Sequence, residues 1–288
     1  MSTSEPISQL FQSTTAKQEG HSVLYHWQRF EVSLDRTDED RLVQFLRTGK
    51  LRCSSPAIFN DPWDCGEWFN TAILQSAEER EKFANFLSRS LVQLPPAHLA
   101  RFKPLLEKLK NHDADATRFM LNLAHVISVQ KYLRYRIYCL APDPTKVLMW
   151  SHYANNHKGI CLEFNVGNKV FSGAHKCVYL SKYPTTPFYE SESFVPLRTF
   201  LSKSDVWEYE SEFRLITHER SIARTASENM LLTDESFLQL PDGALSSIIV
   251  GLRGNYAEVR RIVKENDPSV KVKRAVMASN SYRLTIED

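Results

Sequence analysis

The segment from Val206 to Ile216 constrains the fold most, because apolar and charged side chains alternate along it. Side chains two residues apart point to the same face of a strand, so this alternation predicts a strand. Its charged face carries Glu208, Glu210, Glu212 and Arg214. The apolar face stays only partly in phase, which predicts a bulge or a break of register near Ser211. Glu210 and Glu212 repel each other on one face unless water, Arg214 or a ligand compensates their charge.

Composition gives no sign of a membrane protein. Hydrophobic residues make up 42% and aromatic residues 11% of the 288 residues, which is typical of an ordinary soluble enzyme. No apolar run is long enough to span a bilayer. Residues 1–20 are rich in Ser, Thr and Gln and lack a basic start followed by an apolar stretch, so we expect a flexible tail and not a signal peptide. We therefore expect a cytoplasmic protein that does not bind a membrane.

Cysteine and histidine spacing argues against a metal site. The five cysteines are odd in number, and no two of them are separated by only two residues. This spacing is typical neither of a disulfide framework nor of a zinc ribbon. His152 and His157 lie five residues apart, whereas a metal-binding pair on a helix needs a spacing of four. We expect no bound metal.

The hydrophobic pattern predicts strands near both ends of the chain and helices in the middle. Expected helices cover residues 38–48, 77–92, 96–110, 116–133 and 256–265. Expected strands cover 23–27, 51–54, 136–140, 159–164, 176–180, 206–217, 245–250, 270–275 and 282–286. This order predicts an α+β fold. We expect one domain over residues 21–288, with a helical insertion at 76–135.

Residues 101–136 are basic. They hold eight Lys or Arg and three Asp or Glu, a local net charge of +5. Such a stretch is typical of a polyanion-binding surface, for RNA or DNA, and also of an ordinary solvated helix face. A second candidate for phosphate binding, the turn Gly251–Gly254, lacks the third glycine and the Lys-Ser/Thr ending of phosphate loops. We interpret it as a strand-to-helix turn.

Four strings of the sequence carry a family resemblance. They are FNDPWDC (residues 59–65), LMWSHYANNHKGICLEF (148–164), KSDVWEYESEFRLI (203–216) and IIVGLRG (248–254). A widespread prokaryotic family of unknown function has the same strings in the same order, and the chain resembles it over nearly its whole length from Leu24 onward.

The order of the predicted elements also resembles the ADP-ribosyltransferase fold, a split antiparallel β sandwich that holds NAD in a cleft. That resemblance implies an enzyme that uses NAD as a substrate. It implies that His26, on the first strand, contacts the nicotinamide ribose. It further implies that Glu212 is the catalytic carboxylate and that Glu210, two residues earlier, is its partner.

The remaining NAD-binding candidates lie on several predicted elements. The Tyr or Ser that completes such sites has no unambiguous match, because Ser54, Ser55, Tyr153 and Tyr179 all compete for it. The turn at Asn60 and Asp61 is expected either to cap neighbouring amides or to shape the pocket, and Trp150 and Tyr153 either to pack in the core or to offer rings for stacking. The cofactor-binding set is His26, Tyr25, Ser54, Asn60, Asp61, Trp150, Tyr153 and Arg214.

Three functions fit these residues. The preferred one is an NAD-dependent ADP-ribosyltransferase-like enzyme that modifies a protein or a nucleic acid, in the manner of a toxin or antiphage-defence effector with an antitoxin-like partner. Physical chemistry supports the carboxylates, because charge develops on the ribose as a glycosidic bond to nicotinamide breaks. The alternatives are a non-catalytic module that binds nucleic acid or protein, and a nucleotide hydrolase acting through Glu210 and Glu212. For these two glutamates the competing interpretation is an ion pair with Arg214 or with the basic helices.

Overall fold

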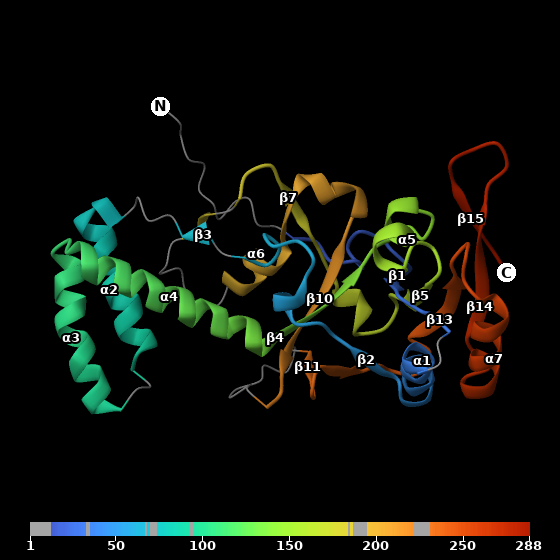
Figure 1. The fold of residues 1–288 in the computed structure, drawn as a ribbon, viewed down its shortest axis with the longest axis horizontal. Coiled ribbons are helices and arrows are strands. Elements are labelled where there is room, and N and C mark those ends of the chain that lie inside the picture. The colour runs from blue at the N-terminus through green and yellow to red at the C-terminus, as the bar shows by residue number, and fades with distance from the viewer. Residues whose placement is uncertain are drawn as a thin grey trace. The chain divides into compact units, whose positions relative to one another are not determined.

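The computed structural model describes residues 13–32, 35–66, 68–69, 74–92, 95–183, 185–186, 195–221 and 231–288. Helices and several sheets share the described chain, so the fold is α+β, as predicted (Figure 1). Two compact units make up this fold. The first contains Met1–Ser55, Arg136–Tyr179 and Asp205–Asp288, and the second contains Pro56–Tyr135 and Leu180–Ser204.

The main sheet of the first unit has the strand order β1-β5-β13-β14-β15. Its strands are β1 (Val23–Gln28), β5 (Ile160–Asn165), β13 (Leu245–Val250), β14 (Lys271–Met277) and β15 (Leu284–Glu287). Strand β5 is antiparallel to both β1 and β13, whereas β13 and β14 are parallel. Helix α7 (Tyr256–Asn266) connects the two parallel strands. The inner strands β5 and β13 are buried along most of their length, which accounts for their nearly continuous apolar sequence.

A second sheet of the first unit has the order β11-β10-β4, and β6 also pairs with β10. Its strands are β4 (Tyr135–Leu140), β6 (His175–Lys176), β10 (Phe213–Glu219) and β11 (Leu232–Thr233). A separate pair joins β2 (Lys50–Arg52) to β12 (Phe237–Gln239). Single bridges connect Tyr25 to Ala141 and Ser54 to Ile137. Strand β4 and the residue after it are therefore linked to the strand that carries His26.

Local sequence explains the helices of the first unit. Helix α1 (Thr37–Thr48) buries Leu42 and Leu46, one turn apart, and ends at Gly49, which has a φ of 62°. A glycine adopts this left-handed conformation at little cost. Helix α7 begins where the side chain of Asn255 accepts a hydrogen bond from the Glu258 amide. The shorter helical segments are α5 (Val147–Tyr153), η4 (Phe171–Gly173) and η5 (Asp205–Glu210).

The second unit contains the predicted middle helices. They are α2 (Ala77–Ser90), α3 (Pro96–Lys110) and α4 (Ala114–Arg134), and they pack around an apolar core that includes Phe83, Leu87, Leu109 and Met120. Arg80 of α2 is buried, and its guanidinium donates to the carbonyls of Leu74, Gln75 and Lys110. The unit's other elements are η2 (Pro56–Ile58), β3 (Trp68–Phe69), β8 (Thr185–Thr186), α6 (Val195–Leu201) and β9 (Ser202–Ser204).

The predicted strand over residues 206–217 is wrong in its first half. Residues Asp205–Glu210 form the 3₁₀ helix η5, Ser211 has a φ of 50°, and β10 starts only at Phe213. Because side chains repeat every three residues in a 3₁₀ helix, Glu208 and Glu210 point in different directions. The expected break near Ser211 is present. Alternation of apolar and charged residues favours a strand here, but tertiary contacts of Lys146 with Tyr209 and Ser211 stabilise the turn instead.

Two further expectations need correction. The strand predicted at 176–180 is divided into β6 and β7 (Val178–Leu180), with Cys177 between them, whose amide donates to the carbonyl of Glu212 (2.8 Å). Residues 13–20 belong to the expected flexible tail, yet Ala16 is fully buried, and its amide donates to the Ala174 carbonyl. The small apolar side chain of Ala16 therefore packs in the core. Residues 1–12 of that tail lie outside the described residues.

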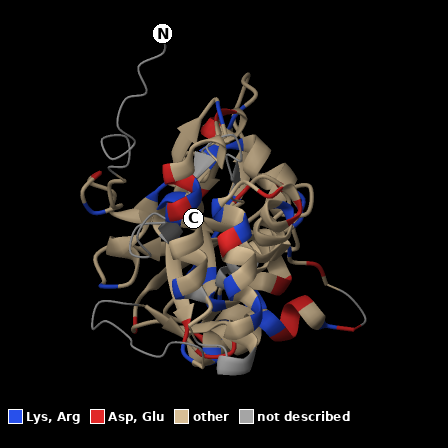
Figure 2. Ribbon diagram, turned by 90° about the vertical axis from the view of Figure 1, so that its left-hand side faces the viewer, with Lys and Arg blue, Asp and Glu red and all other residues tan. Residues whose placement is uncertain are grey.

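Charges are mixed along the ribbon, with basic and acidic residues interleaved (Figure 2). In the basic stretch 101–136, Arg118 pairs with Asp115 (2.8 Å) and Lys110 with Glu107 (3.4 Å), each three residues apart on a helix. Polyanion binding by this stretch stays a prediction. Among the described residues, no helix combines the length and the apolar character that crossing a bilayer requires.

Candidate functional site

The candidate site lies in the first unit, where α5 and η5 meet. Glu210 is the last residue of η5, and its side chain is buried, with 2% of the residue exposed. The hydroxyl of Tyr153, the last residue of α5, donates a hydrogen bond to Glu210 Oε1 (2.7 Å). A buried carboxylate needs such donors, because burial without hydrogen bonds disfavours its charged form. Tyr153 and Glu210 are 57 residues apart in sequence.

Lys146 holds the turn that positions Glu210. Its ammonium group, just before α5, donates to the Tyr209 carbonyl (2.5 Å) and to Ser211 Oγ (2.9 Å). Burial lowers the pKa of Lys146, and the negative charges of Asp143 and Glu210 act in the opposite direction. The Ser211 amide also donates to the Glu208 carbonyl, which closes the last turn of η5. These contacts bend the chain near Ser211, where the sequence alternation predicted a bulge or a break of register.

Glu212 forms a buried ion pair with Arg214. The guanidinium donates to both carboxylate oxygens, Nε to Oε1 over 2.8 Å and Nη2 to Oε2 over 2.9 Å. Arg214 is fully buried and Glu212 is 3% exposed. The backbone of Glu212 is fixed as well, because its amide donates to the Tyr179 hydroxyl (2.8 Å) and its carbonyl accepts from Cys177. The carboxylate is therefore held in one orientation by a bidentate partner.

His26, on β1, is a neutral hydrogen-bonding group. Its Nδ1 lies 2.7 Å from the Cys139 carbonyl, which can only accept, so Nδ1 carries the proton. The ring stacks on Tyr138, with 4.1 Å between ring centroids. Desolvation of the ring lowers the pKa of His26 to about 4, although the bond to the Cys139 carbonyl acts in the opposite direction. Near neutral pH, His26 thus contributes a dipole and not a charge.

Strand β4 lies between the segments that carry two residues of the predicted NAD site, His26 and Glu212. Cys139 of β4 accepts the His26 bond, and β10, which begins immediately after Glu212, lies next to β4 in the second sheet. The structure also joins Glu210 to Tyr153 and Glu212 to Arg214. Asn60 and Asp61 belong to the second unit, so their convergence with His26 and Glu212 stays a prediction.

Several predicted contact residues have mainly structural surroundings. Tyr25 is buried and bridges to Ala141, and desolvation together with the Glu163 charge raises its pKa to about 12. Ser54 pairs through its backbone with Ile137. Trp150 is fully buried, and its indole Nε1 donates to the Pro144 carbonyl (2.7 Å). The core therefore encloses the ring that was expected to stack on a ligand.

In the second unit, the acidic turn that was expected to shape the pocket bonds to itself. Asp61 is buried, and its Oδ1 accepts from the amide of Trp63, two residues on (2.9 Å). This is the turn-capping arrangement that Asp favours in tight turns.

Sequence reasoning missed the aromatic cluster beside Glu210. Trp207 of η5 lies with its ring centroid 6.1 Å from that of His152 on α5 and 6.1 Å from that of Tyr209. His152 in turn lies 6.0 Å from Tyr153. A signal was present for Tyr209 and His152, which adjoin Glu210 and Tyr153 in sequence. Trp207 adjoins no candidate residue, and its place in the cluster follows from the 3₁₀ helix.

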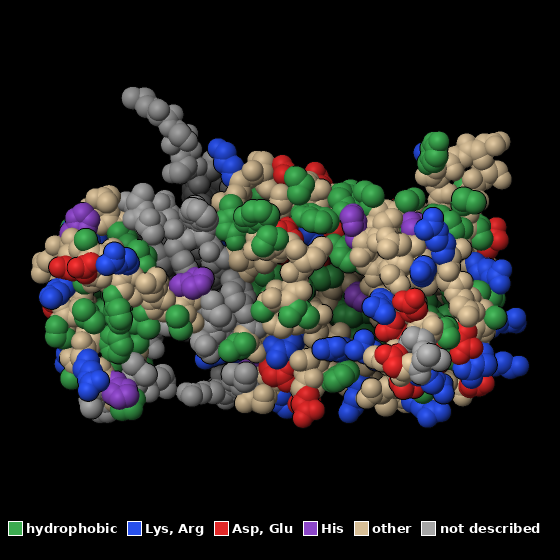
Figure 3. Space-filling view, in the orientation of Figure 1, with side chains coloured by type: hydrophobic (Ala, Val, Ile, Leu, Met, Phe, Trp, Pro, Cys, Tyr) green, Lys and Arg blue, Asp and Glu red, His purple; other side chains and the backbone are tan. Residues whose placement is uncertain are grey.

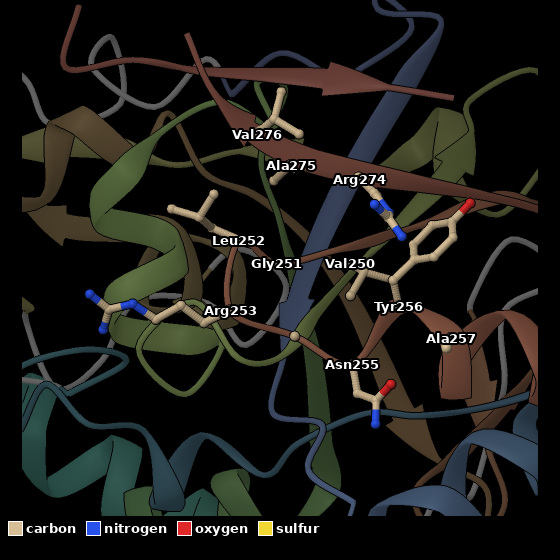
Figure 4. A pocket seen from close by; sticks show the side chains of 11 residues that line it. Val250, Gly251, Leu252, Arg253, Asn255, Tyr256, Ala257, Arg274, Ala275 and Val276 are labelled. Carbon is tan, nitrogen blue, oxygen red and sulfur yellow. The ribbon is translucent and has the colours of Figure 1, made fainter.

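A pocket of about 600 Å³ lies elsewhere in the first unit, at the turn between β13 and α7 (Figure 4). The guanidinium of Arg274 sits 3.8 Å from the centre of the Tyr256 ring, while Arg253 extends away from it. The turn packs against backbone, since a Cβ on Gly251 would lie 2.3 Å from the His157 carbonyl oxygen. The two cations do not converge, and Asn255 already caps the helix, so we do not place the candidate site here.

The site can support acid–base and electrostatic chemistry. Glu210 with Tyr153 offers a carboxylate and a phenol in a shared hydrogen bond, and Glu212 offers a second, oriented carboxylate. In the described part of the chain, no group of three His, Cys, Asp or Glu side chains is arranged to hold a metal ion. None of the five cysteines, all of which lie in described residues, takes part in a disulfide bond.

Comparison with known proteins finds one family model that matches part of the chain, and this part carries most of the site. Residues 149–215, which include Tyr153, Glu210 and Glu212, match a family described as "Protein of unknown function (DUF2971)". No curated protein and no solved structure matches the chain.

Proposed function

We propose that this protein is an ADP-ribosyltransferase-like enzyme that cleaves NAD and transfers ADP-ribose to a macromolecule. The observation that carries the proposal is the pair of buried carboxylates on either side of the Ser211 turn, Glu210 bonded to a phenol and Glu212 fixed by a guanidinium. Carboxylates held in a water-poor site stabilise the positive charge that develops on ribose when nicotinamide leaves.

The proposed roles follow from the two environments. Arg214 favours the ionised form of Glu212, so this carboxylate keeps its charge in spite of burial. We assign to Glu212 the stabilisation of the ribose in the transition state. Glu210 shares a hydrogen bond with the Tyr153 hydroxyl, which gives it a route for accepting a proton. We assign to Glu210 the activation of the incoming acceptor group.

His26 supports the same proposal from the first strand. A neutral ring that donates from Nδ1 to the Cys139 carbonyl leaves Nε2 as an acceptor for a ribose hydroxyl. The two sheets of the first unit, bridged at Tyr25 and Ala141, support the proposal, but the pairs β13–β14 and β10–β11 are parallel and depart from an antiparallel sandwich. Substrate binding would then use His26 for the ribose and the rings of Tyr153 or Trp207 for stacking.

One observation favours a different function. The bidentate pair of Glu212 and Arg214 is a stable structural arrangement, and a module that only binds a partner would need nothing more from it. In that case the glutamates shape the surface and do no chemistry. A nucleotide hydrolase acting through the same two carboxylates is the third candidate, and it differs from a transferase only in using water as the acceptor.

Incubation with NAD labelled on its adenylate half separates the three functions. The transferase releases nicotinamide and attaches the label to protein or nucleic acid of a cell extract. A hydrolase releases nicotinamide, and all of the label stays in small molecules. A binding module leaves NAD intact, and that result would refute the proposed enzyme.

A further inference from the structure

Helices α5 and η5 form an exposed apolar surface beside the candidate site. Val206 is 70% exposed and Leu148 is 49% exposed, although both are large aliphatic side chains. In the space-filling view, hydrophobic side chains lie among polar ones in the upper middle of the face, beside the region of α5 (Figure 3). Contiguous apolar patches of this kind mark interaction sites more often than single exposed residues do. We call Leu148, His152, Val206 and Trp207 the α5–η5 surface.

Ring and helix geometry make this surface continuous. His152 and Trp207 meet edge to face, with 6.1 Å between centroids and an interplanar angle of 72°. Leu148 lies one helical turn before His152, and residues four apart share a face of a helix. Lys146 fixes η5 to the start of α5 through the Tyr209 carbonyl, so the two elements present the surface as one body.

Two carboxylates flank the surface. Asp205 and Glu208 are both exposed, and their spacing of three residues places them on one side of the 3₁₀ helix. Within the described residues neither forms an ion pair. The ammonium group of Lys146, which holds the end of η5, donates to Tyr209 and Ser211. The rim of the α5–η5 surface is therefore acidic.

We propose that the α5–η5 surface docks a protein segment in which an apolar side chain is flanked by Lys or Arg. The apolar side chain packs on Trp207 and Val206, and the basic groups pair with Asp205 and Glu208. A nucleic acid is disfavoured, because the same carboxylates repel its phosphates. Glu210 directly follows Tyr209 at the end of this surface, so, resting on the proposed function, the docked segment carries the acceptor group.

A peptide array tests the docking. Immobilised twelve-residue peptides vary charge sign and apolar content independently, and the full-length protein is applied without NAD. We expect retained peptides to combine Lys or Arg with Leu or Phe, and binding to weaken as salt rises. Asp205→Asn with Glu208→Gln should weaken binding about tenfold at low salt, and Val206→Ser about fivefold. Trp207→Ala provides a second apolar truncation should Val206→Ser misfold.

Two matched control variants remove an exposed apolar side chain and an exposed carboxylate outside the α5–η5 surface. Met277→Ser removes an apolar side chain that is 72% exposed, and Asp242→Asn removes an exposed charge. Both should bind the peptides like the unaltered protein. Retention of acidic peptides, tighter binding of a single-stranded oligonucleotide, or equal binding by all variants overturns the docking proposal. NAD cleavage without peptide binding refutes the docking proposal alone. Peptide binding without NAD cleavage refutes the proposed function and supports the α5–η5 surface as a docking site.

Discussion

The carboxylate of Glu212 accepts two hydrogen bonds from the guanidinium of Arg214, two residues further along the chain. Both side chains are buried, with Glu212 between the 3₁₀ helix η5 and β10 and Arg214 at the second position of β10. A pair of this kind serves stability and ligand chemistry at once, because it fixes a charge where water is scarce. Separating the two contributions requires variants that report on folding and on turnover independently.

Removing Arg214 should be far more costly than removing a surface arginine. Arg214→Met leaves the Glu212 charge buried without its bidentate partner, and we expect a loss of about 3–5 kcal/mol in the free energy of unfolding. The matched control is Arg220→Met, because Arg220 pairs with Asp234 at the same distance of 2.8 Å but with both side chains exposed. Its loss should stay below about 1 kcal/mol. Equal losses in urea unfolding would contradict the structural role of the buried pair.

The hydroxyl of Tyr153 should stabilise the fold through Glu210. Tyr153→Phe removes the donor and leaves one oxygen of a buried carboxylate without this bond. We expect a loss of about 1–3 kcal/mol, measured by thermal or urea unfolding. Tyr282→Phe, at a fully exposed ring, is the control and should change nothing measurable. A Tyr153→Phe protein as stable as the control would show that the hydrogen bond carries no net free energy.

His26 should make stability depend on pH below neutrality. The pKa of His26 in the folded protein is about 4, against about 6.5 for an unperturbed histidine, so the unfolded chain binds a proton more readily between these values. The stabilisation is therefore complete above pH 6.5 and is lost as the pH falls toward 4, by at most about 3 kcal/mol. Unfolding of wild type and His26→Gln at pH 7 and 4.5 measures it. An identical pH slope in the two proteins would argue against a neutral, desolvated His26.

Lys146 should hold η5 in place. Lys146→Met keeps the length of the side chain but removes the donor to the Tyr209 carbonyl and Ser211 Oγ. We expect amide exchange over residues 206–211 to speed up about tenfold or more, which corresponds to about 1.4 kcal/mol of local opening. Lys158→Met, at an exposed lysine of the same unit, is the control. Unchanged exchange in the first variant would show that other contacts fix the turn.

Long periodic segments of the sequence predicted the fold well. The helix expected at 96–110 and the strand expected at 245–250 match the observed bounds, because in both cases the local pattern agrees with the packing. The strand expected at 206–217 failed in its first half, where a lysine 63 residues away bonds the Tyr209 carbonyl. Sequence periodicity carries no record of such a contact.

The same limit applies to the candidate site. Its carboxylates were identifiable from the spacing of Glu210 and Glu212, and the pairing of Glu212 with Arg214 was one of the two interpretations of that spacing. The partnership of Tyr153 with Glu210 could not be read from sequence, since it depends on how α5 meets η5. Trp150 was assigned to a stacking surface because an aromatic residue looks alike in a core and in a pocket until burial is known.

The most direct test of the proposed NAD cleavage is the rate of nicotinamide release by wild type and by Glu212→Gln, expressed per folded molecule. Wild type should turn over NAD, and Glu212→Gln should be slower by about a hundredfold or more, beyond any loss of folded protein. Glu210→Gln should still hydrolyse NAD and lose transfer to the acceptor. Equal turnover by folded wild type and folded Glu212→Gln, or no turnover of NAD by wild type, would contradict the proposal.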